Sequence, residues 1–177
     1  MTTAPNLSDF TKSEIKDVLN EIRHPVDVAV YSVGNYFNVA GIIRTSHSFL
    51  VRNIYLIDVE TPKEPYYAKG TMSSHRHENI ILQTSEVFLQ MISDEHRNLV
   101  SFERRPGILQ PKTIWGYKYP ETPILLFGSE THGVPDNILQ VSMDTVCIPM
   151  YGLNNDLNVS VAAAIAISDF VRKHYGY

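Results

Sequence analysis

The sequence predicts one α/β domain built around a parallel β-sheet. Short apolar runs bounded by turn-forming residues recur along the chain, and amphipathic helical patterns separate several of them. A succession of strand, helix and strand is typical of a parallel sheet with crossover helices. The length of 177 residues suits one domain with a sizeable core.

The first 25 residues precede this alternation. We expect a helix over Ser8–Arg23, because Thr11 and Glu14 have the spacing of a capping box and an apolar stripe follows at helical period. The His24-Pro25 pair is expected to end this helix. The chain is therefore divided into an N-terminal helical extension, residues 1–25, and a main domain, residues 26–177.

The main domain begins with a strand–helix–strand unit. Val26–Val33 is a strongly apolar strand, and Asn38 is placed to cap a helix over Val39–Phe49. Asn53–Val59 is the second strand of the unit. A weaker stretch that contains proline and serine then leads to a short third strand, Ile80–Gln83.

The second half of the main domain continues the alternation. Ser85 is expected to cap an amphipathic helix, and Leu99–Phe102 follows as a strand. The polar segment Glu103–Thr122 is long for a connection, and segments of that length carry function or local structure. The remaining expected elements are the strand Ile124–Phe127, the short helix Pro135–Val141, the strand Val146–Ile148 and the final helix Val159–His174.

Two irregular loops, Gly128–Gly133 and Pro149–Asp156, follow the last two strands and mark the expected binding site. Ligands of open α/β sheets lie outside the carboxyl ends of the strands. The first loop has GxxxxG spacing, but Val134-Pro135 replaces the Lys and Ser/Thr of a phosphate-binding loop, and the chain has no GxGxxG. The pattern therefore does not support nucleotide hydrolysis or dinucleotide chemistry, and the two glycines are read as turn residues.

Composition narrows the class of protein. A formal net charge of −4 argues against a general nucleic-acid binder, although local basic patches such as Arg104-Arg105 remain. The single cysteine, Cys147, lies in an expected strand, so we expect a core residue and not a nucleophile. No apolar run reaches the ~18 residues of a membrane span, and the N-terminus lacks the pattern of a signal peptide, so a cytoplasmic protein is expected.

Three polar features have two readings on the residues alone. Arg44 lies in an otherwise apolar helix, where it either reaches solvent or binds phosphate. The run Asn154–Asn158 is either a helix entry or part of a site. His75-Arg76-His77 is a poor ligand set for a metal, so we expect a solvated loop or one that contacts phosphate.

Three segments together resemble the SpoU-like branch of the SPOUT RNA methyltransferases. The segments are 38–45 (NVAGIIRT), 125–135 (LLFGSETHGVP) and 148–162 (IPMYGLNNDLNVSVA), and their order and spacing match the motifs of that family over about residues 26–174. The resemblance implies a parallel-sheet α/β domain with a C-terminal trefoil knot and a homodimer. It also implies S-adenosylmethionine as cofactor and methylation of a ribose 2′-OH in RNA.

The same resemblance assigns candidate site residues. Arg44 would bind the adjacent phosphate and stabilise the developing alkoxide, while Asn38 and Asn158 would fix the loops or contact RNA. The full catalytic set is Arg44, Asn38, Asn158 and Asp156. The cofactor-binding set is Phe102, Gly128, Glu130, Ile148, Met150 and Leu157. The RNA-binding set is Arg44, Arg76, Arg104 and Arg105, and no metal is implied.

Asp156 departs from the family pattern, which has serine at this position, and Leu50 replaces a usual glycine. The leading interpretation is an enzyme that methylates the ribose of structured RNA. It favours tRNA over rRNA, because many rRNA-directed members carry an additional N-terminal RNA-binding domain. The alternatives are a catalytically impaired, knotted RNA-binding paralogue and an enzyme that methylates a base.

Overall fold

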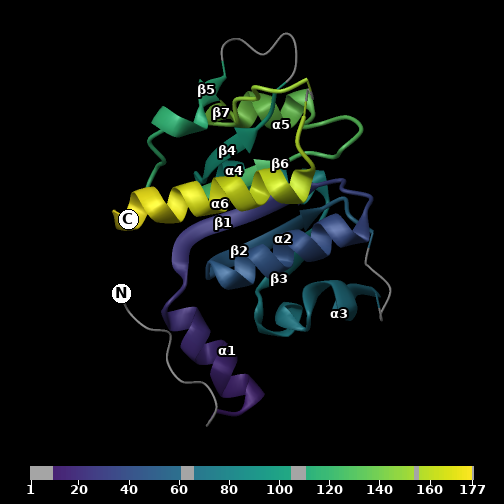
Figure 1. Ribbon diagram of the computed structural model, residues 1–177, viewed down its shortest axis with the longest axis vertical. Helices are drawn as coiled ribbons and strands as arrows, with labels where there is room; N and C mark the ends of the chain where they lie inside the picture. Colours follow the sequence, from purple (N-terminus) through teal and green to yellow (C-terminus); the bar gives the residue numbers. More distant parts are fainter. Residues whose placement is uncertain (1–9, 61–65, 105–110, 154–155, 177) are drawn as a thin grey trace.

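A seven-stranded sheet in which every neighbouring pair is parallel forms the centre of the protein. The computed structural model describes residues 10–60, 66–104, 111–153 and 156–176. The strand order is β3-β2-β1-β6-β4-β7-β5 (Figure 1). The strands are β1 (His24–Tyr31), β2 (Val51–Ile57), β3 (Ile80–Gln83), β4 (Asn98–Phe102), β5 (Lys112–Thr113), β6 (Pro123–Phe127) and β7 (Asp144–Cys147). The predicted parallel α/β fold is confirmed.

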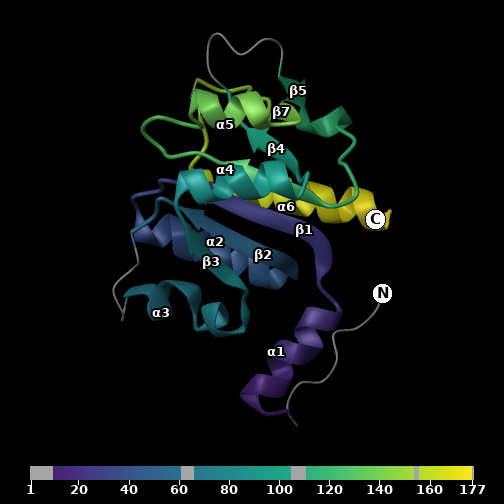
Figure 2. The same cartoon turned by 180° about the vertical axis from the view of Figure 1, so that it is seen from behind.

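Helices cover both faces of the sheet. The helices α2 (Tyr36–Ser48) and α6 (Val159–Tyr175) lie on one face, and α4 (Ser85–Asp94) and α5 (Asp136–Val141) lie on the other (Figures 1 and 2). Successive strand residues point to opposite faces. Val28 and Val30 of β1 therefore belong to the core under α2 and α6, whereas Ala29 belongs to the core under α4 and α5. Burial on both faces explains why the strands read as continuous apolar runs.

The helix α1 (Lys12–Glu21) lies at one end of the molecule (Figure 1). Its predicted capping box is confirmed: Thr11 accepts a hydrogen bond from the Glu14 backbone N–H, and the Glu14 carboxylate accepts one from the Thr11 N–H at 2.7 Å. The helix ends at Glu21, before the His24-Pro25 pair that was expected to end it, and this pair begins β1. The division at residue 25 stays a prediction.

Two helix caps differ from the sequence-based expectation. Asn35, not Asn38, caps α2, and its side-chain oxygen accepts the Phe37 N–H at 2.9 Å. Thr84, not Ser85, caps α4. In both cases the true cap lies upstream of the predicted one, because a polar residue there already has the extended backbone that a cap requires. Asn38 is consequently inside α2, and its side chain is available for contacts outside the helix.

The two stretches with weak patterns contain short elements. The helix α3 (Tyr66–Thr71) and the 3₁₀ helix η1 (Ser74–His77) precede β3. The long polar segment contains β5 and the 3₁₀ helix η2 (Ile114–Gly116), which bears out local structure within Glu103–Thr122.

A buried carboxylate at the start of the sheet generates a prediction about stability. Asp27 in β1 has a fully buried side chain, and it accepts hydrogen bonds from Arg52 at 2.8 and 3.0 Å, from Asn53 at 3.1 Å and from Arg97. Asp27→Asn removes the charge that both guanidinium groups face. Loss of one partner of a buried ion pair typically costs about 3–5 kcal/mol, and we expect a value near the lower end because Arg52 is partly exposed. Urea unfolding measures the change.

The matched control is Glu95→Gln. Glu95 also pairs with Arg97, at 3.3 Å, but its side chain is 56% exposed. Exposed pairs contribute about 0–1 kcal/mol, so this variant should unfold close to the wild-type midpoint. Equal midpoints for the Asp27 and Glu95 variants would contradict the role given to Asp27.

Candidate functional site

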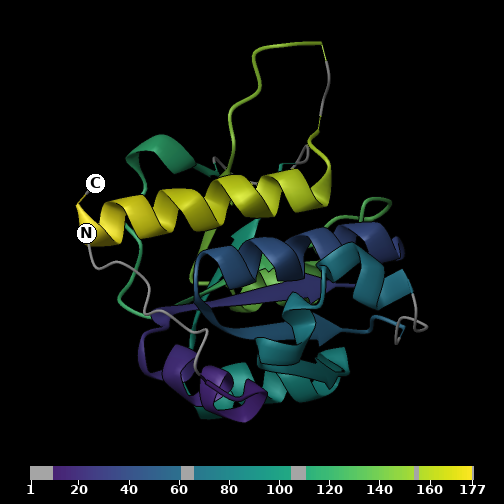
Figure 3. The same ribbon diagram turned by 60° about the horizontal axis from the view of Figure 1, so that its bottom comes forward.

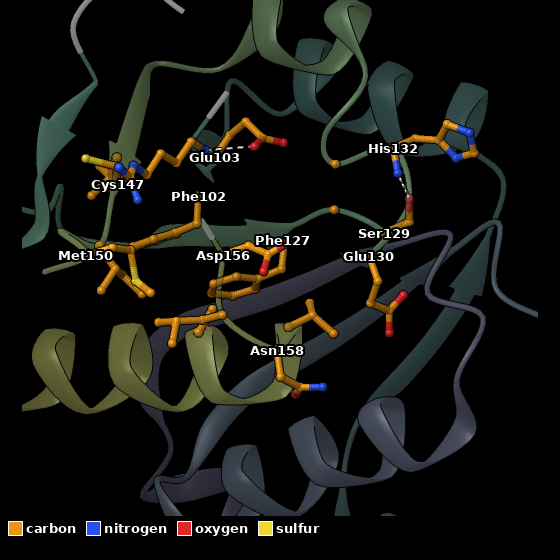
Figure 4. Close-up of a pocket in the computed structure, with 18 of the residues that line it drawn as sticks. Phe102, Glu103, Phe127, Ser129, Glu130, His132, Cys147, Met150, Asp156 and Asn158 are labelled. Carbon is orange, nitrogen blue, oxygen red and sulfur yellow. Dashed lines mark hydrogen bonds between the residues drawn. The ribbon is translucent and has the colours of Figure 1, made fainter. Parts of the chain in front are cut away.

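A cleft of about 480 Å³ lies at the carboxyl ends of β4, β6 and β7. Its lining comes from these strand ends, from the loops that follow them and from the start of α6 (Figure 4). All six positions of the predicted cofactor-binding set line it: Phe102, Gly128, Glu130, Ile148, Met150 and Leu157. The loops after β6 and β7 therefore meet at one site, where a ligand of an open α/β sheet is expected. Ligand binding by these residues stays a prediction.

The apolar side of the cleft is formed by two stacked phenyl rings. Phe102 and Phe127 are paired residues at the ends of β4 and β6, and their ring centroids lie 5.1 Å apart. Both are buried, with 8% and 2% of their surface exposed. Met150 and Cys147 lie at one end of the cleft, and Glu130 and His132 lie at the other (Figure 4). The cleft thus offers an apolar middle with polar groups at its rim.

Cys147 is half-buried in β7 and lines this cleft. Burial raises the pKa of its thiol, and the nearby Arg104 charge opposes this only in part. A raised pKa keeps the thiol protonated near neutral pH, and the thiol is a poor nucleophile. The expectation of a core residue is wrong, because Cys147 is only partly buried and lines the cleft. The expectation that it is not a nucleophile stays a prediction.

The turn that follows β6 requires both of its glycines. The Gly133 N–H donates to the Ser129 carbonyl at 2.9 Å, and Gly133 has a φ of +66°. A Cβ at Gly128 would overlap the backbone of Gly133, and a Cβ at Gly133 would overlap the Glu103 carboxylate. The reading of these glycines as turn residues is confirmed.

Glu103, which the sequence reading did not single out, holds this turn against β4. One carboxylate oxygen accepts the Val134 N–H at 2.6 Å, and the other accepts the Arg104 N–H at 2.7 Å. The side chain therefore joins the end of β4 to the loop that follows β6. The available sequence signal was a carboxylate directly after a buried strand at the ligand-binding edge of the sheet.

Asn38 connects three segments that are distant in the sequence. Its amide nitrogen donates to Glu130, and its side-chain oxygen accepts from Asn158 Nδ2 at 3.0 Å. The Asn158 oxygen in turn accepts from the Ser160 N–H at 3.0 Å and caps α6. Asn38 is only 8% exposed. One side chain thus ties α2, the loop after β6 and the start of α6 together.

Charged residues predicted for the catalytic and RNA-binding sets lie in two different hollows. Asp156 and Arg104 line the cleft, together with Glu103 and Glu130. Arg44 does not line it; its exposed side chain lines a separate hollow beside α2. In the described part of the chain no ion pair joins Arg44 to Asp156.

The other two RNA-binding candidates lie elsewhere. Arg76 is exposed in η1, and Arg105 lies outside the described residues. Within residues 10–60, 66–104, 111–153 and 156–176, no group of three or more His, Cys, Asp or Glu side chains could hold a metal ion. None of the described helices is both long enough and apolar enough to span a membrane.

The fold and the cleft together define a parallel α/β protein with a ligand site built from the loops after β4, β6 and β7. The model of the SpoU rRNA Methylase family matches residues 25–168, and the chain belongs to this family. The resemblance seen in the three sequence motifs is confirmed.

Two kinds of relatives support this assignment. The tRNA (guanosine(18)-2′-O)-methyltransferase of Aquifex aeolicus is 26% identical over 90% of this chain and 74% of its own length. The solved TrmH/SpoU tRNA modifying enzyme of A. aeolicus has a TM-score of 0.78 at 24% identity, over 93% of this chain and 84% of the other. The SpoU methyltransferase AviRb of Streptomyces viridochromogenes, solved in complex with the cofactor AdoMet, has a TM-score of 0.77 at 17% identity, over 88% of this chain and 63% of the other.

The packing around Gly128 generates a prediction. Gly128→Ala forces the added methyl group into the Gly133 backbone, and overpacking of this kind typically costs about 1–3 kcal/mol. Gly116→Ala is the matched control, because its Cβ would meet no atom within 4 Å. In urea unfolding we expect a clear loss of stability for the first variant and almost none for the second. Similar midpoints would show that the turn does not need glycine at 128.

Proposed function

We propose that this protein transfers the methyl group of S-adenosylmethionine to a ribose 2′-OH of RNA. The observation that carries the proposal is the meeting, in one cleft, of all six positions that the family motifs assign to the cofactor. The relatives support it: those of A. aeolicus and Thermus thermophilus are tRNA (guanosine(18)-2′-O)-methyltransferases, and AviRb was solved with AdoMet.

The residues of the cleft suit this cofactor. A volume of about 480 Å³ lies in the range of small-molecule sites, which are mostly apolar with a few placed polar groups. Phe102 and Phe127 supply buried apolar surface, and the glycine at 128 lets the backbone of Gly133 pack closely in the turn that lines the cleft. Ile148, Met150 and Leu157 would hold the cofactor from the other side. When bound, S-adenosylmethionine supplies a methyl group activated by a sulfonium.

The remaining tasks fall to the residues of this chain. The hydroxyl oxygen must be placed in line with the methyl group, and its proton must be accepted. Asp156, a carboxylate that lines the cleft, is our candidate for the proton acceptor. Arg44 is exposed and lies outside the cleft, beside a separate hollow, and it is suited to bind an RNA phosphate next to the reacting ribose. Asn38 and Asn158 position the cleft loops through their mutual hydrogen bond.

A homodimer is part of the proposal. Large apolar side chains are exposed on α2, on α6 and on the loop between β7 and α6: Phe37 is 66% exposed, Val161 45%, Tyr151 87% and Leu153 fully. The part of this loop before residue 154 stands away from the body of the molecule (Figure 3). Exposed large apolar side chains favour a protein contact, and a second copy of the chain is the partner that we propose for them. We also propose the trefoil knot, to which the placement of β6 between β1 and β4 lends support.

We propose tRNA before rRNA as the substrate, with support from the relatives that are tRNA methyltransferases. A 23S rRNA (adenosine(1067)-2′-O)-methyltransferase of Streptomyces azureus is also a relative, so rRNA is the second candidate. A catalytically impaired RNA-binding paralogue is the alternative function, and Asp156 in place of the usual serine is the observation that favours it.

Calorimetry and RNA mapping test the activity. An enzyme should bind S-adenosylmethionine with a micromolar dissociation constant, equivalent to ~8 kcal/mol. Mass mapping of RNA incubated with the protein and cofactor should show a new 2′-O-methylated nucleotide. A chain that binds RNA but neither binds the cofactor nor methylates would be the impaired paralogue. Methylation found on a base would replace the ribose assignment.

The role of Asp156 is tested by Asp156→Ser, which restores the usual family residue. If Asp156 accepts the hydroxyl proton, we expect methyl transfer to fall by roughly 10²-fold or more. Cofactor affinity measured by calorimetry should stay within about twofold, because the apolar cleft is unchanged. Asp156→Asn keeps the size of the side chain but cannot accept the proton, so its methyl transfer should fall by the same factor. A strong increase in methyl transfer by the serine variant would show that Asp156 is not the proton acceptor.

A further inference from the structure

A second hollow, of about 240 Å³, lies between α2 and the turn from α3 to η1. Its lining is Arg44, His47 and Ser48 from α2, with Thr71, Met72, Ser73, Ser74 and His77 from the α3–η1 segment. One arginine, two histidines and four hydroxyls therefore surround it, and none of the described residues in this lining is acidic. The cofactor cleft, in contrast, is lined by three carboxylates, those of Glu103, Glu130 and Asp156.

A buried ion pair behind the hollow fixes the orientation of one imidazole. His47 Nδ1 lies 2.7 Å from a carboxylate oxygen of Glu78, whose side chain is fully buried. Because Nδ1 is engaged, Nε2 is the ring nitrogen left for a ligand. His47 is 33% exposed, so a ligand in the hollow can reach it.

Arg23 compensates the charge of Glu78. It donates to the carboxylate at 2.8 Å, and its side chain is only 2% exposed. It also donates to the His77 carbonyl at 2.5 Å, which holds the end of η1 in place. The charge of Glu78 behind the hollow is therefore balanced by that of Arg23. Arg44 is the charged group at the surface of the hollow. Arg44 makes no ion pair with any described residue.

The hydroxyls of the lining are not equivalent. Ser48 donates to the Arg44 carbonyl at 3.1 Å, and Ser74 donates to the Thr71 carbonyl at 2.7 Å. The hydroxyl of Thr71 lies 2.6 Å from His75 Nδ1. Ser73 donates to no group in the described part of the chain, and its φ of +66° places it at the tip of the turn. Its hydroxyl is the one with a proton to offer to a ligand.

We propose that this hollow binds a phosphodiester group of the RNA substrate, through Arg44, His47 Nε2 and the Ser73 hydroxyl. The inference rests on the proposed function. A planar guanidinium and a hydroxyl are donors to phosphate oxygens, and Nε2 of His47 is a donor in the imidazolium form, in which Nδ1 also keeps its proton toward Glu78. Because phosphate contacts set the register of a bound strand, the hollow positions the RNA so that one ribose reaches the cofactor cleft. Inorganic phosphate has the same chemistry, so the test must separate the two sources.

The test uses two variants outside the catalytic and cofactor-binding sets, Ser73→Ala and His47→Gln. The probe is bulk tRNA, with binding followed by fluorescence anisotropy at several salt concentrations. We expect each variant to weaken RNA binding about three- to tenfold, while the dissociation constant for S-adenosylmethionine is unchanged. The matched controls are Ser93→Ala and His96→Gln at the end of α4, which should bind RNA as the wild type does. Ser73→Ala keeps the test valid if the histidine variant fails to fold.

A second arm titrates inorganic phosphate and follows the imidazole resonances of the wild-type protein. Resonances of His47 and His77 should shift, and that of His96 should not. If Ser73→Ala and His47→Gln both bind RNA with the affinity of the wild type, the proposal is wrong, whether or not phosphate shifts the resonances. A shift with unchanged RNA affinity would identify a site for free phosphate instead. Failure of the proposed function is seen separately, as loss of cofactor binding or methyl transfer in the wild type.

Discussion

The hydrogen bonds of Asn38 are the constraint on which the candidate site depends. Glu130 is 92 residues from Asn38 along the chain, and Asn158 is 120 residues away. Fixing such distant segments costs chain entropy, and the buried side-chain amide of Asn38 would be costly without partners. Asn38 has both partners only when α2, the loop after β6 and the start of α6 lie together. The same contact therefore closes the fold and shapes the cleft, which explains why the three motifs occur together in one chain.

The cofactor cleft and the second hollow differ in charge. This difference explains how a chain with a net charge of −4 can act on a polyanion, as we propose. Sequence totals average over the surface, whereas an RNA strand responds to the local field within about 8–10 Å at ordinary ionic strength. Acidic side chains gather at the cleft, where the proposed cofactor carries a sulfonium charge. Arg44 and the imidazoles gather around the second hollow. Segregation of charge over a short distance favours one orientation of the substrate.

Much of the fold was predictable from sequence, because parallel strands buried on both faces give strong apolar runs. The strand Ile80–Gln83 was placed at its observed bounds and five others within a few residues, whereas the short strand β5 was not predicted. The caps at Asn35 and Thr84 were missed, since several polar residues near a helix start can serve and only the backbone conformation decides among them. The cofactor positions came from motif resemblance, not from spacing. The contacts of Glu103 and the hollow at His47 depend on residues far apart in the sequence, which no local pattern records.

The N-terminal extension is connected to the proposed RNA site through Arg23. This residue belongs to the extension by sequence pattern, yet its guanidinium is buried and bonded to Val51, His77 and Glu78. Without Arg23, Glu78 would keep a fully buried charge faced only by His47, and an unpaired buried carboxylate is costly enough to shift its protonation or open the structure. Either outcome would move His47 and the end of η1. Arg23 therefore helps to set the geometry of the hollow.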